Sequence, residues 1–587
     1  MKKGFLIYVI LVGAFSVNAQ QKSRDTIVAT EIVNVITKYN PKIANAQKIK
    51  EVPKIELLEK SNKKKLTYTI FSAPVASTFI PKTGVSKGIN VGVKERIYNN
   101  YFAGGYGNYA SPYAELFINK TNRLNNEFGL HATYNASEEN IKNSVLNSNF
   151  LNFNMTTFFK QEERYFDWKV SIDAAQNNYN WYGLPQDKSF TENTISAIHE
   201  AQNYRHLKLV GGFKFHDSYI DFGKVAVSYF TDKFKSSEVL VNFDANLAFP
   251  LDFLSSSLND ISVATGIEFL KGSFQNDYAN ASKINYNIIT AKLIPEYTLN
   301  YLGISLKASL RTFISLDIEN AATNFFMFPD VFLQTRILQN YINGYAGFTG
   351  NLETNTYQEF TEENPYVSPT LFITQTAESS NFFIGFKGNI SKNINYNLKV
   401  SIKKEEDKPL FLRNNSKSNG ITSTENSQPL KGYEYGNSFS IYYDDVKSTS
   451  IFAEIEYLFD KNLTFTTHIK YDNYTTTTAL ENWNLPSLQT SILANYTSEK
   501  WYANATIYYV SERKDAVYTT TFPSSLNGAE TLSSFVDVNL NGGYHFNDKF
   551  SAFLKLNNML NTEYQRFANF NTQGFQALAG ITYKFDF

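Results

Sequence analysis

Polar and apolar residues alternate along most of this chain. From about residue 100 to the C-terminus, every second position is apolar over long stretches, for example from Ile394 to Ile402, from Leu463 to Tyr471 and from Val536 to Tyr544. Successive residues of a β-strand point to opposite sides, so each stretch predicts a strand with one apolar and one polar face. The pattern predicts an all-β fold.

The lengths of the alternating stretches separate two kinds of all-β protein. Strands of a soluble sandwich usually span 3–10 residues. Here many stretches run longer, as in 149–160, 203–215, 438–458 and 578–587. A strand that crosses a membrane at a tilt needs roughly 9–11 residues. The pattern therefore favours a transmembrane antiparallel β-barrel over a soluble adhesin built from two stacked sheets.

The connections between the predicted strands alternate between short and long, as in outer-membrane barrels with short periplasmic turns and long extracellular loops. Short turns are predicted near 120–124, 161–164, 216–218, 254–259, 301–302, 339–342, 391–393, 460–462, 498–500 and 547–548. Long connections are predicted near 135–148, 179–202, 276–285, 314–325, 353–381, 406–437, 475–486, 513–533 and 558–577. Counting from a first strand at 100–109 gives about 22 strands, with Phe439 to Leu458 taken as one strand although Asp444-Asp445 could divide it.

The first 95 residues differ from the predicted barrel, which we place at 96–587. Lys2 and Lys3 precede a short apolar run, and Val17-Asn18-Ala19 resembles a cleavage site, so residues 1–19 are predicted to be a secretory signal peptide. Residues 20–95 contain few aromatic residues and are predicted to form a mostly extended periplasmic segment. Its Lys60 to Lys65 charge run is best interpreted as a solvated stretch. These features predict export to the outer membrane.

The last predicted strand carries an aromatic edge. Ile581, Tyr583, Phe585 and Phe587 share one face of that strand, with Gly580, Thr582, Lys584 and Asp586 on the other. Aromatic girdles mark the membrane interfaces of such barrels. We therefore predict that these four residues, together with Trp501, anchor the barrel in outer-membrane lipid. A terminal aromatic residue on such a strand also resembles the C-terminal signature of outer-membrane barrels.

The composition of the chain excludes several kinds of binding and catalysis. The formal net charge is zero, with 55 basic and 55 acidic residues, which gives no general attraction to nucleic acid. Cysteine is absent, so thiol catalysis and Cys-ligated metal sites are excluded. No nucleophile-and-base spacing, P-loop or dinucleotide motif is found. We predict a non-enzymatic protein without a cofactor.

Two groups of residues could bind a metal ion but have simpler interpretations. The six His residues are His131, His199, His206, His216, His468 and His545, and no His follows His199-Glu200 at the spacing of a helical zinc protease motif. Isolated His residues in strands are best explained as polar residues of the lumen or girdle. Glu405-Glu406-Asp407 and Asp444-Asp445 could hold Ca²⁺ on an outer loop, because hard cations prefer clustered oxygens. Solvated loop acids are the simpler interpretation.

Short motifs near the C-terminus resemble a known family. Leu556 to Tyr564 (LNNMLNTEY), Glu481 to Pro486 (ENWNLP) and Glu499 to Tyr502 (EKWY) are similar to the ends of TonB-dependent receptor barrels, in particular those of Bacteroidota. The resemblance covers roughly 100–587 and implies a 22-stranded barrel. Such receptors carry a plug of more than a hundred residues, which residues 20–95 are too short to form. Asp25 to Thr30 vaguely resembles a TonB box, but an ordinary strand-forming hexapeptide explains it better.

Barrel width leads to two functional hypotheses. A 22-stranded barrel is too wide for side chains of its wall to fill, so its lumen must be closed. Residues 20–95, inward-folded loops such as 353–381 and 406–437, or another protein could do this. The first hypothesis is a plugless, receptor-like barrel that serves as a structural subunit of an outer-membrane complex, such as the β-barrel assembly machinery or a secretion assembly, with outer-membrane or periplasmic proteins as partners. The second is a TonB-dependent receptor or large-pore channel for nutrient uptake.

Overall fold

The computed structural model describes residues 97–587, apart from 123–124, 187, 252–258, 281, 340 and 520–523. The predicted signal peptide and the predicted segment 20–95 lie outside the described residues.

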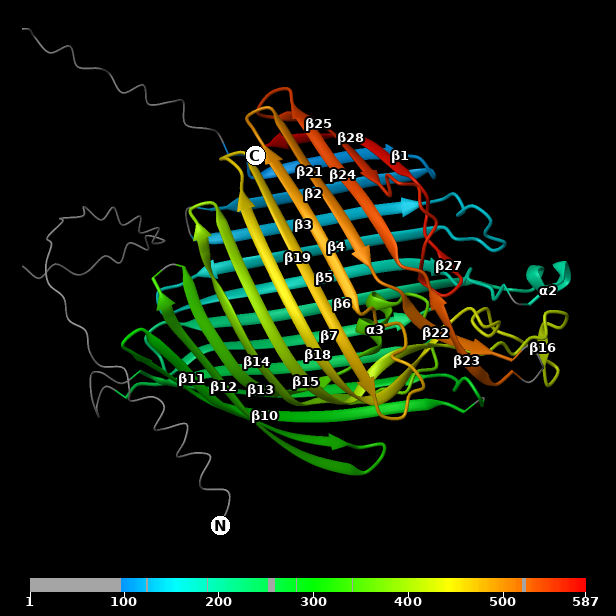
Figure 1. Ribbon diagram of the computed structural model, residues 1–587, viewed down its shortest axis with the longest axis horizontal. Coiled ribbons are helices and arrows are strands. Elements are labelled where there is room, and N and C mark those ends of the chain that lie inside the picture. Colours follow the sequence, from blue (N-terminus) through cyan, green and yellow to red (C-terminus); the bar gives the residue numbers. More distant parts are fainter. Residues whose placement is uncertain are drawn as a thin grey trace, which may run out of the picture. The chain divides into compact units, whose positions relative to one another are not determined.

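Twenty-two antiparallel strands form one sheet (Figure 1). The first eleven are β1 (Asn100–Gly107), β2 (Ser111–Thr121), β3 (Asn126–Ser137), β4 (Phe150–Glu162), β5 (Phe166–Asn180), β6 (Ala201–Phe215), β7 (Ile220–Asp232), β8 (Ser237–Phe249), β9 (Ile261–Phe274), β10 (Ile284–Tyr301) and β11 (Ile304–Asp317). The others are β12 (Ala322–Leu338), β13 (Ile342–Thr354), β14 (Gln375–Ser391), β15 (Ile394–Arg413), β18 (Phe439–Leu458), β19 (Leu463–Thr476), β20 (Leu488–Thr497), β21 (Trp501–Val510), β24 (Phe535–His545), β25 (Phe550–Asn557) and β28 (Gln576–Phe585).

The sheet closes on itself. Each of these strands pairs with its neighbour in the sequence, and β1 also pairs antiparallel with β28, from Asn100 opposite Phe585 to Gly107 opposite Leu578. An even number of strands makes this closure possible, because the first and last strands then run in opposite directions. The predicted closed barrel and its strand count are confirmed, and Phe439–Leu458 is a single strand, as predicted.

The apolar face of the barrel points outward. On β15, Leu398, Val400 and Ile402 are between 43% and 45% exposed, whereas the alternating polar residues line the lumen. The same holds for Ile451 and Ile455 on β18. Large exposed apolar side chains in rows are expected where a wall faces lipid, and the outer-membrane barrel architecture is thereby established in place of two stacked sheets. Among the described residues, no helix is both long and apolar enough to cross a membrane.

Short turns and long loops lie at opposite ends of the barrel, here called the turn end and the loop end. The predicted short turns that the structure describes, such as 161–164, 216–218 and 391–393, lie at the turn end, and most of the predicted turn 254–259 lies outside the described residues. Two predicted long connections are shorter than expected. In place of the predicted connection 314–325, residues 318–321 alone join β11 to β12, because the alternation continues through Leu316 and Asp317. The predicted connection 406–437 is shortened because β15 extends to Arg413. The connections 108–110 and 233–236 are short although they lie at the loop end.

The loops at the loop end contain the remaining elements. These are α2 (Glu192–Ser196), α3 (Tyr357–Glu363), and three small hairpins, β16 (Thr424–Glu425) with β17 (Gln428–Pro429), β22 (Arg513–Tyr518) with β23 (Leu526–Leu532), and β26 (Gln565–Phe567) with β27 (Phe570–Asn571). Loop 355–374, which contains α3, packs against inward-facing residues of β6, β7, β9 and β10. Inward folding of this connection, one of the alternatives considered for closing the lumen, is therefore present.

Candidate functional site

The predicted anchor residues lie on the outer surface near the turn end. Ile581 and Tyr583 of β28 are 48% and 45% exposed, and Phe587 is 81% exposed. The rings of Tyr583 and Phe585 stack with centroids 6.0 Å apart. Trp501 begins β21, is 58% exposed, and lies 4.6 Å from the Tyr544 ring. Their position suits an interfacial girdle, and their role as anchors stays a prediction.

A set of loops closes part of the loop end and is here called the cap: residues 355–374 and 558–575. Helix α3 begins after Thr356, whose side chain accepts a hydrogen bond from the Glu359 amide. This is an ordinary N-cap. The first two amides of α3, of Tyr357 and Gln358, donate instead to the carboxylate of Glu238, at 2.7 and 3.2 Å. A residue of the barrel wall therefore caps a helix of the loop.

Tyr357 is the centre of the cap's aromatic core. Its side chain is fully buried, and its ring makes edge contacts with Tyr204, Phe230 and Phe274, with centroids 6.2, 5.2 and 4.9 Å away. Such edge-to-face pairs are favourable beyond their buried area. The Tyr357 hydroxyl donates to Asp232 at 3.0 Å. The wall thus holds the cap by apolar packing and by two carboxylates.

Both carboxylates lie at the loop end; Glu238 is buried and Asp232 is half-buried. Glu238, the second residue of β8, is 3% exposed and also accepts a hydrogen bond from the Tyr286 hydroxyl at 2.8 Å. Burial raises its pKa to about 7, although the hydrogen bonds oppose this shift. Burial likewise raises the pKa of Asp232, the last residue of β7. The donors to both carboxylates are neutral amide and hydroxyl groups, and neither acid belongs to an ion pair among the described residues.

The second part of the cap joins the first through stacked rings. Tyr366 and Phe570 stack with centroids 3.7 Å apart, and Phe567 lies 5.3 Å from Phe439 at the start of β18. Tyr182 donates to the Asn571 carbonyl at 2.8 Å and lies 3.4 Å from the Tyr366 hydroxyl. The core therefore connects opposite sides of the barrel across its mouth.

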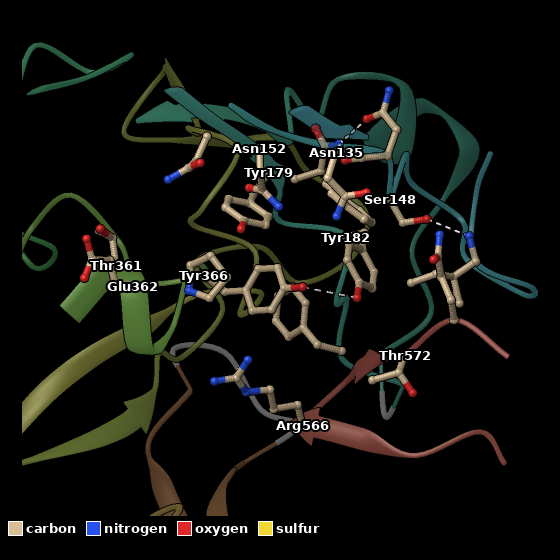
Figure 2. A pocket seen from close by; sticks show the side chains of 18 of the residues that line it. Asn135, Ser148, Asn152, Tyr179, Tyr182, Thr361, Glu362, Tyr366, Arg566 and Thr572 are labelled. Carbon is tan, nitrogen blue, oxygen red and sulfur yellow. Dashed lines mark hydrogen bonds between the residues drawn. The ribbon is translucent and has the colours of Figure 1, made fainter. Parts of the chain in front are cut away.

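A cavity of about 970 Å³ lies between the cap and the inner wall (Figure 2). Inward-facing residues of β2 to β6 and of β24, β25 and β28 form one side, and cap residues such as Thr361, Tyr366 and Arg566 form the other. In Figure 2, Asn135 and Asn152 lie on the wall side of Tyr366, with Arg566 on the far side. Its 32 lining residues include ten Asn and six Tyr. The cavity is polar but carries few charges.

The acidic clusters considered for Ca²⁺ are occupied by protein groups. Glu405 lies in β15 and pairs with Lys403 and Lys408, each at 2.8 Å. Asp444 lies in β18, is 4% exposed, and accepts backbone N–H groups of Thr477, Thr478 and Ala479 between 2.9 and 3.1 Å. Glu405 and Asp444 are therefore buried within strands, and the interpretation as solvated loop acids fails for these two residues, whereas Asp407 is exposed.

The His residues do not come together. His131 faces Glu115 at 3.0 Å, His468 faces Glu454 at 3.2 Å, and His206 contacts Ser228 at 2.8 Å. Within the described ranges, no group of three or more His, Asp or Glu side chains is arranged to hold a metal ion.

Sequence reasoning missed the residues that build the cap and the cavity. Glu238 and Asp232 lie at strand ends and contact a loop more than a hundred residues away. Asn135 falls in the predicted connection 135–148, and the sequence pattern gave no reason to group it with Asn152 and Asn177. The only available signal was the unusual number of Asn residues at inward positions near predicted strand ends.

Comparison with known proteins gives a match in fold. No family model and no curated protein matches the sequence. Among solved structures, the pyoverdine outer membrane receptor FpvA from Pseudomonas aeruginosa PAO1 matches with a TM-score of 0.58 and 13% identity, over 84% of this chain and 79% of that one. The siderophore receptor PirA from Acinetobacter baumannii matches with a TM-score of 0.58 and 11% identity, over 84% and 81%. The ferric-catecholate import receptor Fiu from E. coli K12 matches at 0.57 and 10%, over 84% and 82%. The chain therefore has the fold of these receptor barrels.

Proposed function

We propose that this chain is a non-enzymatic receptor of the outer membrane that takes a polar ligand into the cavity beneath its cap. The supporting observation is the cavity itself. It has about 970 Å³, lies inside the wall at the loop end, and is lined by side chains that form hydrogen bonds. Ligand sites are usually concave and of about 300–1,000 Å³. The structural neighbours are named as receptors, which supports a binding role rather than catalysis.

Several finer features belong to this proposal. The chain is exported by residues 1–19, inserts into the outer membrane with its loop end outward, and is anchored there by Trp501, Tyr583 and Phe587. It is of the Bacteroidota type and lacks a plug, because residues 20–95 are too few to form one. Uptake would then occur without a plug domain on which TonB could act.

A second candidate function is an accessory subunit of a larger outer-membrane complex. The cap supports it, because fully buried side chains such as Tyr357 and Phe439 fix the loops across the mouth. A rigid closed barrel suits a scaffold for other outer-membrane or periplasmic proteins.

Cysteine labelling in intact cells separates the two functions, since the chain has no native cysteine. Asn154→Cys places a thiol in the cavity, and Asn504→Cys places one on the inner wall of β21 near the turn end. For a receptor, a membrane-impermeant maleimide added outside should label Asn154→Cys much faster than Asn504→Cys. Equal, negligible labelling in cells, together with recovery of stoichiometric partner proteins in mild detergent, would favour the accessory subunit.

A further inference from the structure

We propose that the cavity binds a neutral, hydroxyl-rich ligand of the carbohydrate class, held by a row of amides on β3 to β5 and packed against Tyr366. This inference rests on the proposed receptor function and names its ligand.

The row of amides follows from the strand register. Asn135 of β3 lies directly opposite Asn152 of β4, and Asn152 lies opposite Asn177 of β5. Tyr113 of β2 and Tyr204 of β6 continue the same row at its two ends. All five residues line the cavity. Neighbouring strands are about 4.8 Å apart, so the three amides stand at regular steps over roughly 10 Å. The hydroxyls of Tyr113 and Tyr204 already donate to Glu115 and to the Pro365 carbonyl.

The amides are available to a ligand. Among the described residues, the side chains of Asn135, Asn154 and Asn177 have no hydrogen-bond partner, and all three border the cavity. An amide offers two donors and an acceptor. A hydroxyl group also donates and accepts, so a chain of hydroxyls matches a row of amides better than a purely donating or purely accepting ligand does.

The charges in the cavity argue against an ionic ligand. Its ionised side chains are Glu362, Asp537 and Arg566, apart from the imidazole of His206. Asp537 accepts a hydrogen bond from Tyr564 at 2.9 Å, and Glu362 accepts one from Gln358 at 2.9 Å. With one arginine and two carboxylates, the lining gives no net attraction for a phosphate or an anionic chelate. The binding energy must therefore come from neutral hydrogen bonds and packing.

The side opposite the amides is aromatic. The Tyr366 ring is held by its stack on Phe570, which in turn contacts Tyr182 with centroids 5.0 Å apart. Aromatic rings with a polar tip present an apolar face beside a hydrogen-bonding group. A sugar ring has the same two aspects, C–H groups on its faces and hydroxyls at its edge. A slot with rings on one side and amides on the other fits this chemistry.

The test uses the full-length protein in detergent. A panel of fluorescently labelled neutral oligosaccharides, with linear α-glucans, β-glucans and mannans, is titrated against it and followed by anisotropy. At least one member should bind saturably. The triple variant Asn135→Ala/Asn152→Ala/Asn177→Ala should weaken that binding by roughly 10- to 100-fold, since each amide contributes a modest net hydrogen-bond energy. The matched control is Asn495→Ala/Asn504→Ala, an opposed pair of inner-wall amides outside the cavity, which should leave binding unchanged.

Three results overturn the inference: no sugar of the panel binds, the triple variant binds like the wild type, or the control pair weakens binding equally. A ferric catecholate serves as the anionic probe. If it protects Asn154→Cys from labelling and no sugar does, the receptor function stands and the carbohydrate assignment fails. If Asn154→Cys is never reached from outside in cells, the receptor function itself fails.

Discussion

Replacing Tyr357 by alanine should loosen the cap without unfolding the barrel. The ring is fully buried and contacts three aromatic rings of the wall. Truncating a buried aromatic residue costs about 3–5 kcal/mol, and the substitution also removes the hydroxyl that donates to Asp232. Because about 1.4 kcal/mol corresponds to a factor of ten, the equilibrium for opening residues 355–374 should rise by about 100- to 3,000-fold.

Hydrogen exchange measured by mass spectrometry gives that opening equilibrium directly. Peptides from 355–374 should lose protection, and peptides from strands such as β15 should keep it. The control is Phe372→Ala in the same loop, where the side chain is 54% exposed and the change should stay below about tenfold. Equal effects of the two substitutions would refute the claim that the buried ring of Tyr357 holds the cap.

Three further predictions concern the cap acid, the lipid face and the C-terminus. Because burial raises the pKa of Glu238 from 4.5 in the unfolded chain to about 7, the folded state favours its protonated form. This contribution to stability is complete below about pH 4.5 and is lost as the pH rises through 7. A nitroxide on Phe372→Cys should therefore become more mobile as the pH rises from about 5 to 8, and Glu238→Gln should remove most of that change. Burial raises the pKa of Asp232 as well, so this acid contributes a pH dependence of the same sign. An unchanged mobility profile in the Gln variant would contradict the assignment of the pH dependence to Glu238. Val400→Arg, on the outward face, should destabilise the barrel by about 2–4 kcal/mol in urea unfolding monitored by heat-modifiable gel mobility, whereas the neighbouring inward Ser401→Arg should have little effect. Deleting Phe587 should reduce the folded fraction recovered in outer membranes, and undiminished recovery would remove it from the insertion signature.

The barrel could be predicted from the sequence because its main determinant is local. Each strand shows its two faces directly in the alternation of residues, as from Ile394 to Ile402. Turns at the turn end are short and polar, so they mark strand ends reliably. The errors in the predicted strand boundaries occurred at the loop end, where strands continue beyond the lipid-facing band. There β15 carries Glu405 into a buried ion pair, and polar strand residues resemble loop residues.

The cap and the cavity could not be predicted because their contacts join distant parts of the chain. The bond from the Tyr357 amide to Glu238 spans 119 residues, and Tyr182 reaches the Asn571 carbonyl across 389. No local pattern records such pairs. Recognising the row of Asn135, Asn152 and Asn177 also required the register of the strand pairs, since a shift of one residue in a strand would turn its Asn toward lipid.

The cap and the cavity together determine how binding can work. The cap residues that border the cavity, such as Tyr366, are fixed by stacking and by a buried aromatic core. A preformed site does not lose loop entropy when it binds, so modest hydrogen bonds from neutral amides can suffice for affinity. If the site worked by induced closure instead, the ligand would have to order residues 355–374 on arrival. Loosening the cap therefore provides a test of the mechanism: Tyr357→Ala should weaken ligand binding mainly by lowering the fraction of molecules with an intact cavity, and lowering the pH below 7 should partly restore it through Glu238.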